Sequence, residues 1–225
     1  MPTSTFRPVA GATAPADGHV RRDGVNESFS SIRSGAGSYN TETELSALAG
    51  LFASGTTDQY SDLNRAIFVF DTSSIPDTDT IDSATLYFTP REKNDGLGGS
   101  HSICIVKPSP ASPSDFANSD YNIANWDMTK QTTADMTIGS MSVDTEFSLT
   151  LNATGLSNIS KTGYTYLGMV LDNDQANSAP TWVSGQNAYV GMYSADETGT
   201  TKDPRLEVTH SAASTTVSPL LLSDL

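Results

Sequence analysis

The side chains of this sequence that could carry catalysis are three histidines, one cysteine and many serines and carboxylates. His19, His101 and His210 do not fall at the H-x-x-x-H spacing that places two imidazoles on one metal ion. Composition alone leaves a Ser–His–Asp site open, but the sequence has no G-x-S-x-G turn to present a nucleophilic serine. His210 follows the last predicted strand, where we expect it to face solvent. We therefore predict that the protein has no catalytic residue.

The cysteine and the acids also favour structural interpretations. Cys104 lies between Ile103 and Ile105, and a buried free cysteine behaves as a small apolar side chain. Nothing close to it in the sequence would lower its pKa. A glycosidase would need two acids facing each other across ~5–10 Å, whereas most Asp residues here lie in predicted turns, where they cap backbone N–H groups. We interpret Cys104 as an inert core thiol and the acids as turn residues.

A short acidic segment at the end of a predicted strand could bind calcium. Asp172, Asn173 and Asp174 place hard oxygen donors close together, and Ca²⁺ takes about six to eight such oxygens. A second acidic group lies in a turn between two predicted core strands, at Asp77, Asp79 and Asp82. The alternative for both groups is an ordinary turn rich in Asp and Asn. No EF-hand loop is present.

Aromatic residues in or near predicted loops could form a platform for sugars. They are Trp126, Trp182, Tyr121 and Tyr193. Flat aromatic faces stack on pyranose rings, and Gln186 and Asn187 next to Trp182 could bond to the hydroxyls. The alternative, which we favour, is that the two tryptophans close the ends of the core, as large aromatic side chains usually do.

Two arginines lead predicted core strands in a sequence that is otherwise poor in arginine. Arg65 and Arg205 are each expected to form a bidentate pair with a turn carboxylate, such as Asp71 or Asp203. Such pairs would fix the ends of the strands, which is a role in folding and not in catalysis.

Charge and composition exclude several classes of protein. The chain has 225 residues and a formal net charge of -14, which argues against binding to nucleic-acid phosphates. About a quarter of its positions are Ser or Thr. No apolar run approaches the ~20 residues of a membrane helix, and a single cysteine excludes a disulfide framework within the chain.

The first residues contain no apolar segment typical of a secretion signal, although the hydroxyl-rich composition resembles that of extracellular domains. One explanation is a virion protein that is made in a host cytoplasm and exposed on the virion surface after lysis. The alternative is an extracellular protein whose signal has been removed.

Strand-like segments recur along the sequence between turn signals. Residues 45–52 fit either a short helix or a strand, and 108–125 form a long surface excursion. The predicted strands are 17–24, 29–33, 65–71, 81–88, 102–106, 141–151, 164–171, 188–193 and 205–209. This pattern predicts an all-β fold, a two-sheet antiparallel β-sandwich with jelly-roll or Greek-key connections. We expect an N-terminal arm over 1–16, the sandwich over 17–210, and a tail over 211–225 whose leucines contact another subunit.

Three segments carry a resemblance to a known family. Asn64–Pro76 is an arginine-led apolar strand with a turn ending in Ile-Pro, Ile81–Leu86 contains Ser-Ala-Thr-Leu, and Asp203–Val208 supplies a closing strand after Asp-Pro. This order resembles the DNRLRE-type β-sandwich domains, which are similar to a carbohydrate-binding module family. The resemblance spans roughly 17–210. It implies the sandwich fold, in modules of secreted bacterial proteins or in free-standing phage proteins.

We therefore expect a non-catalytic structural or binding protein at the virion surface of a bacteriophage, in capsid decoration or in a fibre or tail. Its expected partners are copies of itself in a homo-oligomer, other virion proteins and surface glycans, with no nucleic acid and no membrane insertion. The alternative is a carbohydrate-binding module, with calcium as its candidate cofactor. A hydrolase is the third class considered.

Overall fold

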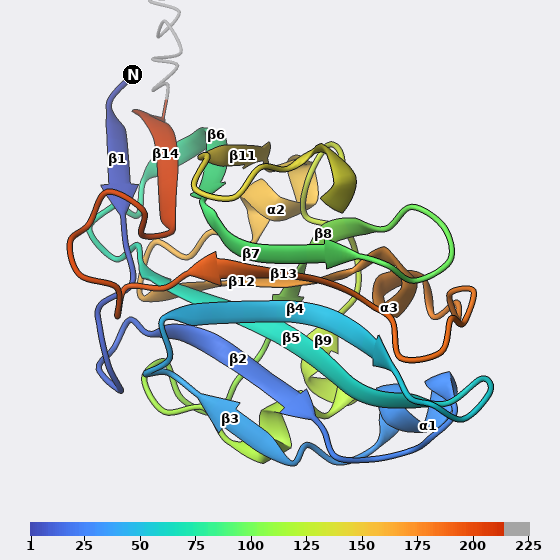
Figure 1. Ribbon diagram of the computed structural model, residues 1–225. Helices are drawn as coiled ribbons and strands as arrows, with labels where there is room; N and C mark the ends of the chain where they lie inside the picture. Colours follow the sequence, from blue (N-terminus) through green and yellow to red (C-terminus); the bar gives the residue numbers. More distant parts are fainter. Residues whose placement is uncertain (214–225) are drawn as a thin grey trace, which may run out of the picture.

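A computed structural model describes residues 1–213 of the chain. In these residues the strands form two antiparallel β-sheets (Figure 1). The smaller sheet has the strand order β1–β14–β6–β11. Its strands are β1 (Thr3–Phe6), β14 (Arg205–Ala212), β6 (Asp79–Phe88) and β11 (Phe147–Thr150). The predicted all-β fold is confirmed, whereas the jelly-roll or Greek-key path stays a prediction.

The larger sheet has the order β10–β8–β12–β5–β4–β13–β7. Three further strands extend it: β2 pairs with β5, β3 pairs with β2, and β9 pairs with β8. Its strands are β2 (Asp17–Arg22), β3 (Tyr39–Thr41), β4 (Ser46–Ala53), β5 (Tyr60–Asp71), β7 (Pro90–Asp95), β8 (Ser102–Pro108), β9 (Trp126–Asp127), β10 (Met136–Thr137), β12 (Tyr164–Leu171) and β13 (Asn187–Tyr193).

Short helical segments join the strands. They are α1 (Phe29–Ser34), α2 (Ala153–Ser157), α3 (Asp172–Ala176) and the 3-10 turns η1 (Asn118–Tyr121), η2 (Ile123–Asn125) and η3 (Ile138–Ser140). Among residues 1–213, no helix has the length and apolar character needed to cross a membrane.

The core lies between the sheets and is centred on β5. Residues 63–70 of this strand are all buried, because β5 pairs with β12, β4 and β2 and is covered on both faces. Its β-branched and aromatic run suits such a position. Leu86 and Val208 of the smaller sheet belong to the same buried cluster as Phe68 of β5, so both sheets contribute to a single core.

The structure contradicts the prediction for residues 29–33 and decides between the two predictions for residues 45–52. The strand predicted at 29–33 is wrong, because these residues form α1. The Ser28 side chain caps that helix by accepting a hydrogen bond from the Ser31 N–H, and helical spacing places Phe29 and Ile32 on one buried face. Residues 45–52, which fitted either a helix or a strand, belong to β4, whose buried Ala47, Ala49 and Leu51 alternate along the strand.

The strand predicted over 141–151 is present only in part. β11 begins at Phe147, and Asp144 before it has a left-handed backbone with φ of 61°. The Asp144 N–H donates to the Pro90 carbonyl, 2.8 Å away. The chain at Asp144 therefore turns beside the start of β7. For this reason residues 141–146, whose apolar and polar side chains alternate in the sequence, do not form a strand.

The predicted N-terminal arm does not describe residues 3–6, which form β1 at the edge of the smaller sheet. Thr3 lies opposite Thr209 in β14, and Phe6 is buried. At the other end, Ser211 and Ala212, expected to begin the tail, are the last residues of β14. The rest of the predicted tail contact, 214–225, lies outside the described residues. Both ends of the described chain therefore leave the fold side by side (Figure 1).

Candidate binding recess

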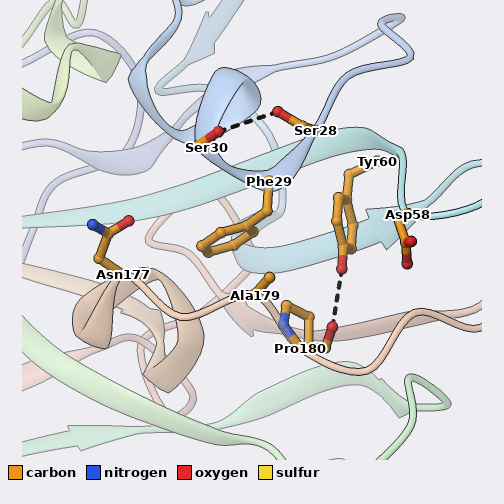
Figure 2. A pocket seen from close by; sticks show the side chains of 8 residues that line it. All are labelled: Ser28, Phe29, Ser30, Asp58, Tyr60, Asn177, Ala179 and Pro180. Atoms are coloured by element: carbon orange, nitrogen blue, oxygen red, sulfur yellow. Dashed lines mark hydrogen bonds between the residues drawn. The ribbon is translucent and has the colours of Figure 1, made fainter.

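A recess with a volume of about 500 Å³ opens where three segments distant in the sequence meet. The start of α1, the turn between β4 and β5, and the segment after α3 form its walls (Figure 2). Its lining residues are Ser28, Phe29, Ser30, Asp58, Tyr60, Asn177, Ala179 and Pro180. We call this site the end recess, because α1, whose first residues line it, lies at the end of the described fold opposite the start of β1 and the end of β14 (Figure 1).

Two Asx residues at the end recess have left-handed backbones. Asp58 has φ of 57° and Asn177 has φ of 53°. Asp and Asn tolerate this conformation better than other side chains that carry a Cβ. Asn177 is also the C-cap of α3, directly after the last helical residue Ala176. Both side chains are exposed, so the turns hold a carboxylate and an amide at the mouth of the recess.

The apolar wall of the recess consists of two packed aromatic rings. Phe29 and Tyr60 meet edge to face, with ring centroids 5.9 Å apart and an interplanar angle of 71°. The Tyr60 hydroxyl donates to the Pro180 carbonyl at 3.1 Å (Figure 2). Burial raises the pKa of Tyr60, so its hydroxyl keeps its proton and holds the segment after α3 against β5.

A buried ion pair positions the two helices that flank the recess. Asp174 of α3 accepts two hydrogen bonds from Arg65 of β5, at 2.7 Å from Nε and 3.0 Å from Nη2. Arg33 of α1 lies 3.0 Å from the same carboxylate. Arg65 also donates to the carbonyls of Arg33 and Tyr121. These contacts fasten α1 and α3 to the central strand and so define the distance across the end recess.

This arrangement suits a small polyhydroxylated ligand. The hydroxyls of Ser28 and Ser30, the Asp58 carboxylate and the Asn177 amide provide hydrogen-bond donors and acceptors beside an aromatic wall. Concave sites with an apolar lining and a few placed polar groups are typical of small-molecule binding. In the sequence these residues carry only local turn and cap signals, because three separate segments build the site.

The structure does not bring the predicted sugar-binding residues into one site. Trp126 is buried, and its indole N–H donates to the Asp120 carbonyl at 2.8 Å. Asn187 and Tyr193 lie at opposite ends of β13, about 20 Å apart for a strand of that length. Asn187 is the first residue of β13, and the exposed Gln186 lies just before it, on the segment that contains Trp182.

The tryptophans and Tyr121 have structural partners. The indole N–H of Trp182 donates to the Gln59 carbonyl at 3.0 Å, which fixes the turn beside Asp58. Tyr121, predicted in a loop, is fully buried, and its hydroxyl donates to the Ile32 carbonyl. The buried position of Trp126 matches the core interpretation that we favoured.

The predicted calcium ligands have separate partners. The Asp174 carboxylate is held by Arg65, the Asn173 amide oxygen lies 2.7 Å from His101 Nδ1, and Asp172 accepts from the Asn173 N–H. Within residues 1–213, no three His, Cys, Asp or Glu side chains are grouped so as to hold a metal ion. The charge of Asp174 is already balanced by arginine, and calcium binding by this segment stays a prediction.

The second acidic group is divided in the same way. Asp79 contacts His210 at 2.7 Å, whereas Asp77 and Asp82 are exposed. The expectation that His210 faces solvent is wrong, because its side chain is only 7% exposed. His19 is also buried, and burial lowers its pKa to about 4.

The interpretation of Cys104 as a core thiol agrees with its position. The residue is fully buried, and burial raises the pKa of its thiol. A thiol held in its neutral form is a poor nucleophile.

Both arginines form ion pairs, but the predicted partners Asp71 and Asp203 are wrong. Arg65 pairs with Asp174 and not with Asp71 or Asp203. Arg205 pairs with Glu146 and Glu207. Arg205 begins β14 as predicted, but Arg65 lies in the middle of β5 and does not fix a strand end. Glu146 and Asp174 come from elements that only the folded chain brings near.

The fold and the end recess together define a β-sandwich protein with a binding-type recess at one end. No family model matches the sequence, and no curated protein matches it significantly. The likeness to DNRLRE-type domains therefore stays a prediction that rests on the three sequence segments described above.

Proposed function

We propose that this β-sandwich is a structural and binding protein of a virion surface, that of a bacteriophage, and that it acts through contact. One observation carries the proposal: the start of β1 and the end of β14 lie at one end of the described fold, and α1, whose first residues line the end recess, lies at the other (Figure 1). A surface protein needs one end for attachment and a second end that faces outward, and this arrangement provides both.

The attachment end is ordered by the pairing of β1 with β14. The His210 N–H donates to the Pro2 carbonyl at 3.1 Å, and Thr3 lies opposite Thr209. We propose that this end of the described fold contacts other copies of the chain or other virion proteins. The net charge of -14 favours a well-hydrated exterior.

Purified particles provide the test. Particles from cells that produce the chain are separated on a density gradient, and their content is measured by mass spectrometry and cryo-electron microscopy. We expect the chain to migrate with the particles in a fixed ratio and to account for outer density. Its recovery only in particle-free or secreted fractions would contradict the proposal.

The end recess favours a second candidate, binding of a surface glycan. The support for this candidate is the exposed polar pair Asp58 and Asn177, which could bond to sugar hydroxyls beside the buried rings of Phe29 and Tyr60. A glycan array followed by calorimetry tests this candidate with Asp58→Ala and Asn177→Ala. Each loss of a hydrogen-bonding partner should weaken binding by about tenfold.

Thr57→Ala provides the matched control for these variants. Thr57 is exposed and adjacent to Asp58 but does not line the recess. Affinity should be unchanged in this variant. Binding that survives both recess substitutions would place the sugar elsewhere, and an array without any binding would remove this candidate.

A further inference from the structure

Three neighbouring strands of the smaller sheet bring a serine, a histidine and an aspartate into contact. Ser4 lies on β1, His210 on β14 and Asp79 on β6, and β14 is the central one of the three strands. His210 Nδ1 lies 2.7 Å from Asp79 Oδ2, and His210 Nε2 lies 3.1 Å from Ser4 Oγ. The order of atoms is that of a nucleophile, a general base and the group that orients the base.

The hydrogen bonds determine which imidazole nitrogen carries the proton. An ionised Asp79 only accepts, so Nδ1 must donate to it. Nε2 of the neutral ring is then the acceptor for the Ser4 hydroxyl. The side chains of His210 and Asp79 are only 7% and 10% exposed, which strengthens the bond between them.

A β-bulge sets this geometry. The register of β14 on β6 shifts between Thr209 and His210, so that His210 lies opposite Ile81. Bulges re-aim side chains and are over-represented near active sites. In the register of the sheet, Ser4 lies opposite Val208 of β14 and Asp79 lies opposite Ala212 of β14. The register shift lies between these two positions of β14.

We propose that Ser4, His210 and Asp79 form a serine-nucleophile site that hydrolyses carboxylic esters of small acyl groups. This activity goes beyond the proposed contact function and departs from the expectation that the chain is non-catalytic. It uses the end of the molecule opposite the end recess.

The reaction has two balanced steps. Ser4 Oγ forms a bond to the ester carbonyl carbon while its proton passes to His210 Nε2, and the imidazolium then returns that proton to the departing alkoxide as the ester C–O bond breaks. Water attacks the acyl-Ser4 carbonyl in the second step, again giving a proton to His210. The carboxylic acid leaves, and Ser4 Oγ regains its proton. Asp79 acts as a positioning residue, because it holds the tautomer of His210.

The edge of the sheet offers a donor for the developing oxyanion. β1 is the outermost strand, and its Pro2 carbonyl faces β14, since it accepts from the His210 N–H. Alternate residues of a strand face opposite sides in the plane of the sheet. The N–H of Thr5, the residue after the nucleophile, therefore faces away from β14, as edge N–H groups do.

Access determines the class of substrate. Ser4 is half-buried between the exposed Thr3 and Thr5, so a carbonyl can approach from the open edge of the sheet. Because Ser4 is half-buried, we propose substrates with a small acyl group, which needs the least room beside the strand. Acetyl esters are thus the simplest probes.

A fluorophosphonate probe and p-nitrophenyl acetate test the proposal on the full chain. We expect the probe to modify Ser4 covalently, detected by mass spectrometry of the peptide. Ester hydrolysis should fall about a hundredfold or more in Ser4→Ala and His210→Ala. Ser83→Ala is the matched control, because Ser83 is exposed on β6 outside the triad, and it should keep the wild-type rate.

Two further variants separate catalysis from a structural clamp. Thr5→Pro removes the proposed oxyanion donor and should lower the rate by roughly tenfold or more, since an outward-facing edge position tolerates proline. Thr3→Pro makes the same change two residues away and should keep the rate. Asp79→Asn should lower the rate and alter its pH profile, because the tautomer of His210 is no longer fixed.

Two results would overturn the proposal. One is folded wild-type protein that leaves Ser4 unmodified by the probe. The other is a Ser4→Ala variant that hydrolyses the ester as fast as wild type. Either outcome would make the three residues a clamp that fastens β1 to the sheet, and neither depends on how the His210 variant folds.

Discussion

Asp174→Asn should destabilise the protein strongly, because it removes the charge that balances Arg65. The Arg65 side chain is fully buried and that of Asp174 is 1% exposed. The substitution keeps the size of the side chain but leaves a buried guanidinium without a counter-ion. Breaking a buried pair in this way costs about 3–5 kcal/mol, a large part of the ~5–15 kcal/mol that stabilises a typical domain.

Scanning calorimetry and urea unfolding measure this change. For a domain of this size, each kcal/mol lowers Tm by roughly 2–4 °C, so Asp174→Asn should lower Tm by roughly 6–20 °C. The double variant Arg65→Met with Asp174→Leu should recover most of the loss, because a well-packed apolar pair replaces a buried ion pair at little cost.

Asp172→Asn is the matched control for this experiment. Asp172 is in the same helix and is 32% exposed, so its substitution should change stability by less than about 1 kcal/mol. An Asp174→Asn variant that melts within roughly 2 °C of wild type, as the control should, would refute the role assigned to the buried pair.

Three further predictions concern other parts of the molecule. Burial raises the pKa of Asp17 from 3.8 to about 8. Between these pH values the folded state therefore binds more protons than the unfolded state, and the free energy of unfolding should fall as pH rises. Asp17→Asn should flatten this pH dependence in urea unfolding measured from pH 4 to 9. An unchanged slope would contradict the raised pKa of Asp17. In Gly168→Ala, the new Cβ would lie 2.4 Å from Trp126 Cζ3, so the free energy of unfolding should fall by about 1–3 kcal/mol in thermal unfolding. Gly55→Ala is the control, because its Cβ meets no atom within 4 Å, and its destabilisation should be far smaller. Truncation after Ala213, beyond the end of β14, should preserve Tm and reduce oligomer size or particle occupancy in light scattering; an unchanged assembly would argue against the predicted tail contact.

The main strands could be predicted from sequence because their signals are local. The run at the centre of β5 consists of consecutive β-branched and aromatic residues, and such a run favours a covered strand wherever it occurs. Residues 29–33, which belong to α1, were predicted wrongly as a strand for the opposite reason. A helix this short is marginal by itself, and packing of Phe29 against Tyr60 stabilises it.

The candidate sites depend on residues too far apart in the chain for local patterns to connect. Arg65 and Asp174 are separated by 109 positions, and Ser4 and His210 by 206. The sequence identified Arg65 as unusual but did not find its partner, and it placed His210 in solvent. The end recess went unpredicted because α1, the β4–β5 turn and the segment after α3 converge only in the folded chain.

The sequence by itself determined the all-β class, the positions of several core strands such as the centre of β5, the acidic hydroxyl-rich composition and the buried nature of Cys104. These properties follow from composition and from the two-residue period of strands, which act over a few neighbouring residues. The tertiary structure alone decided the partners of the charged groups, the edge position of β1 and the contacts of His210. Strand register and the bulge between β6 and β14 set those contacts, because a shift of one residue moves a side chain to the other face of the sheet.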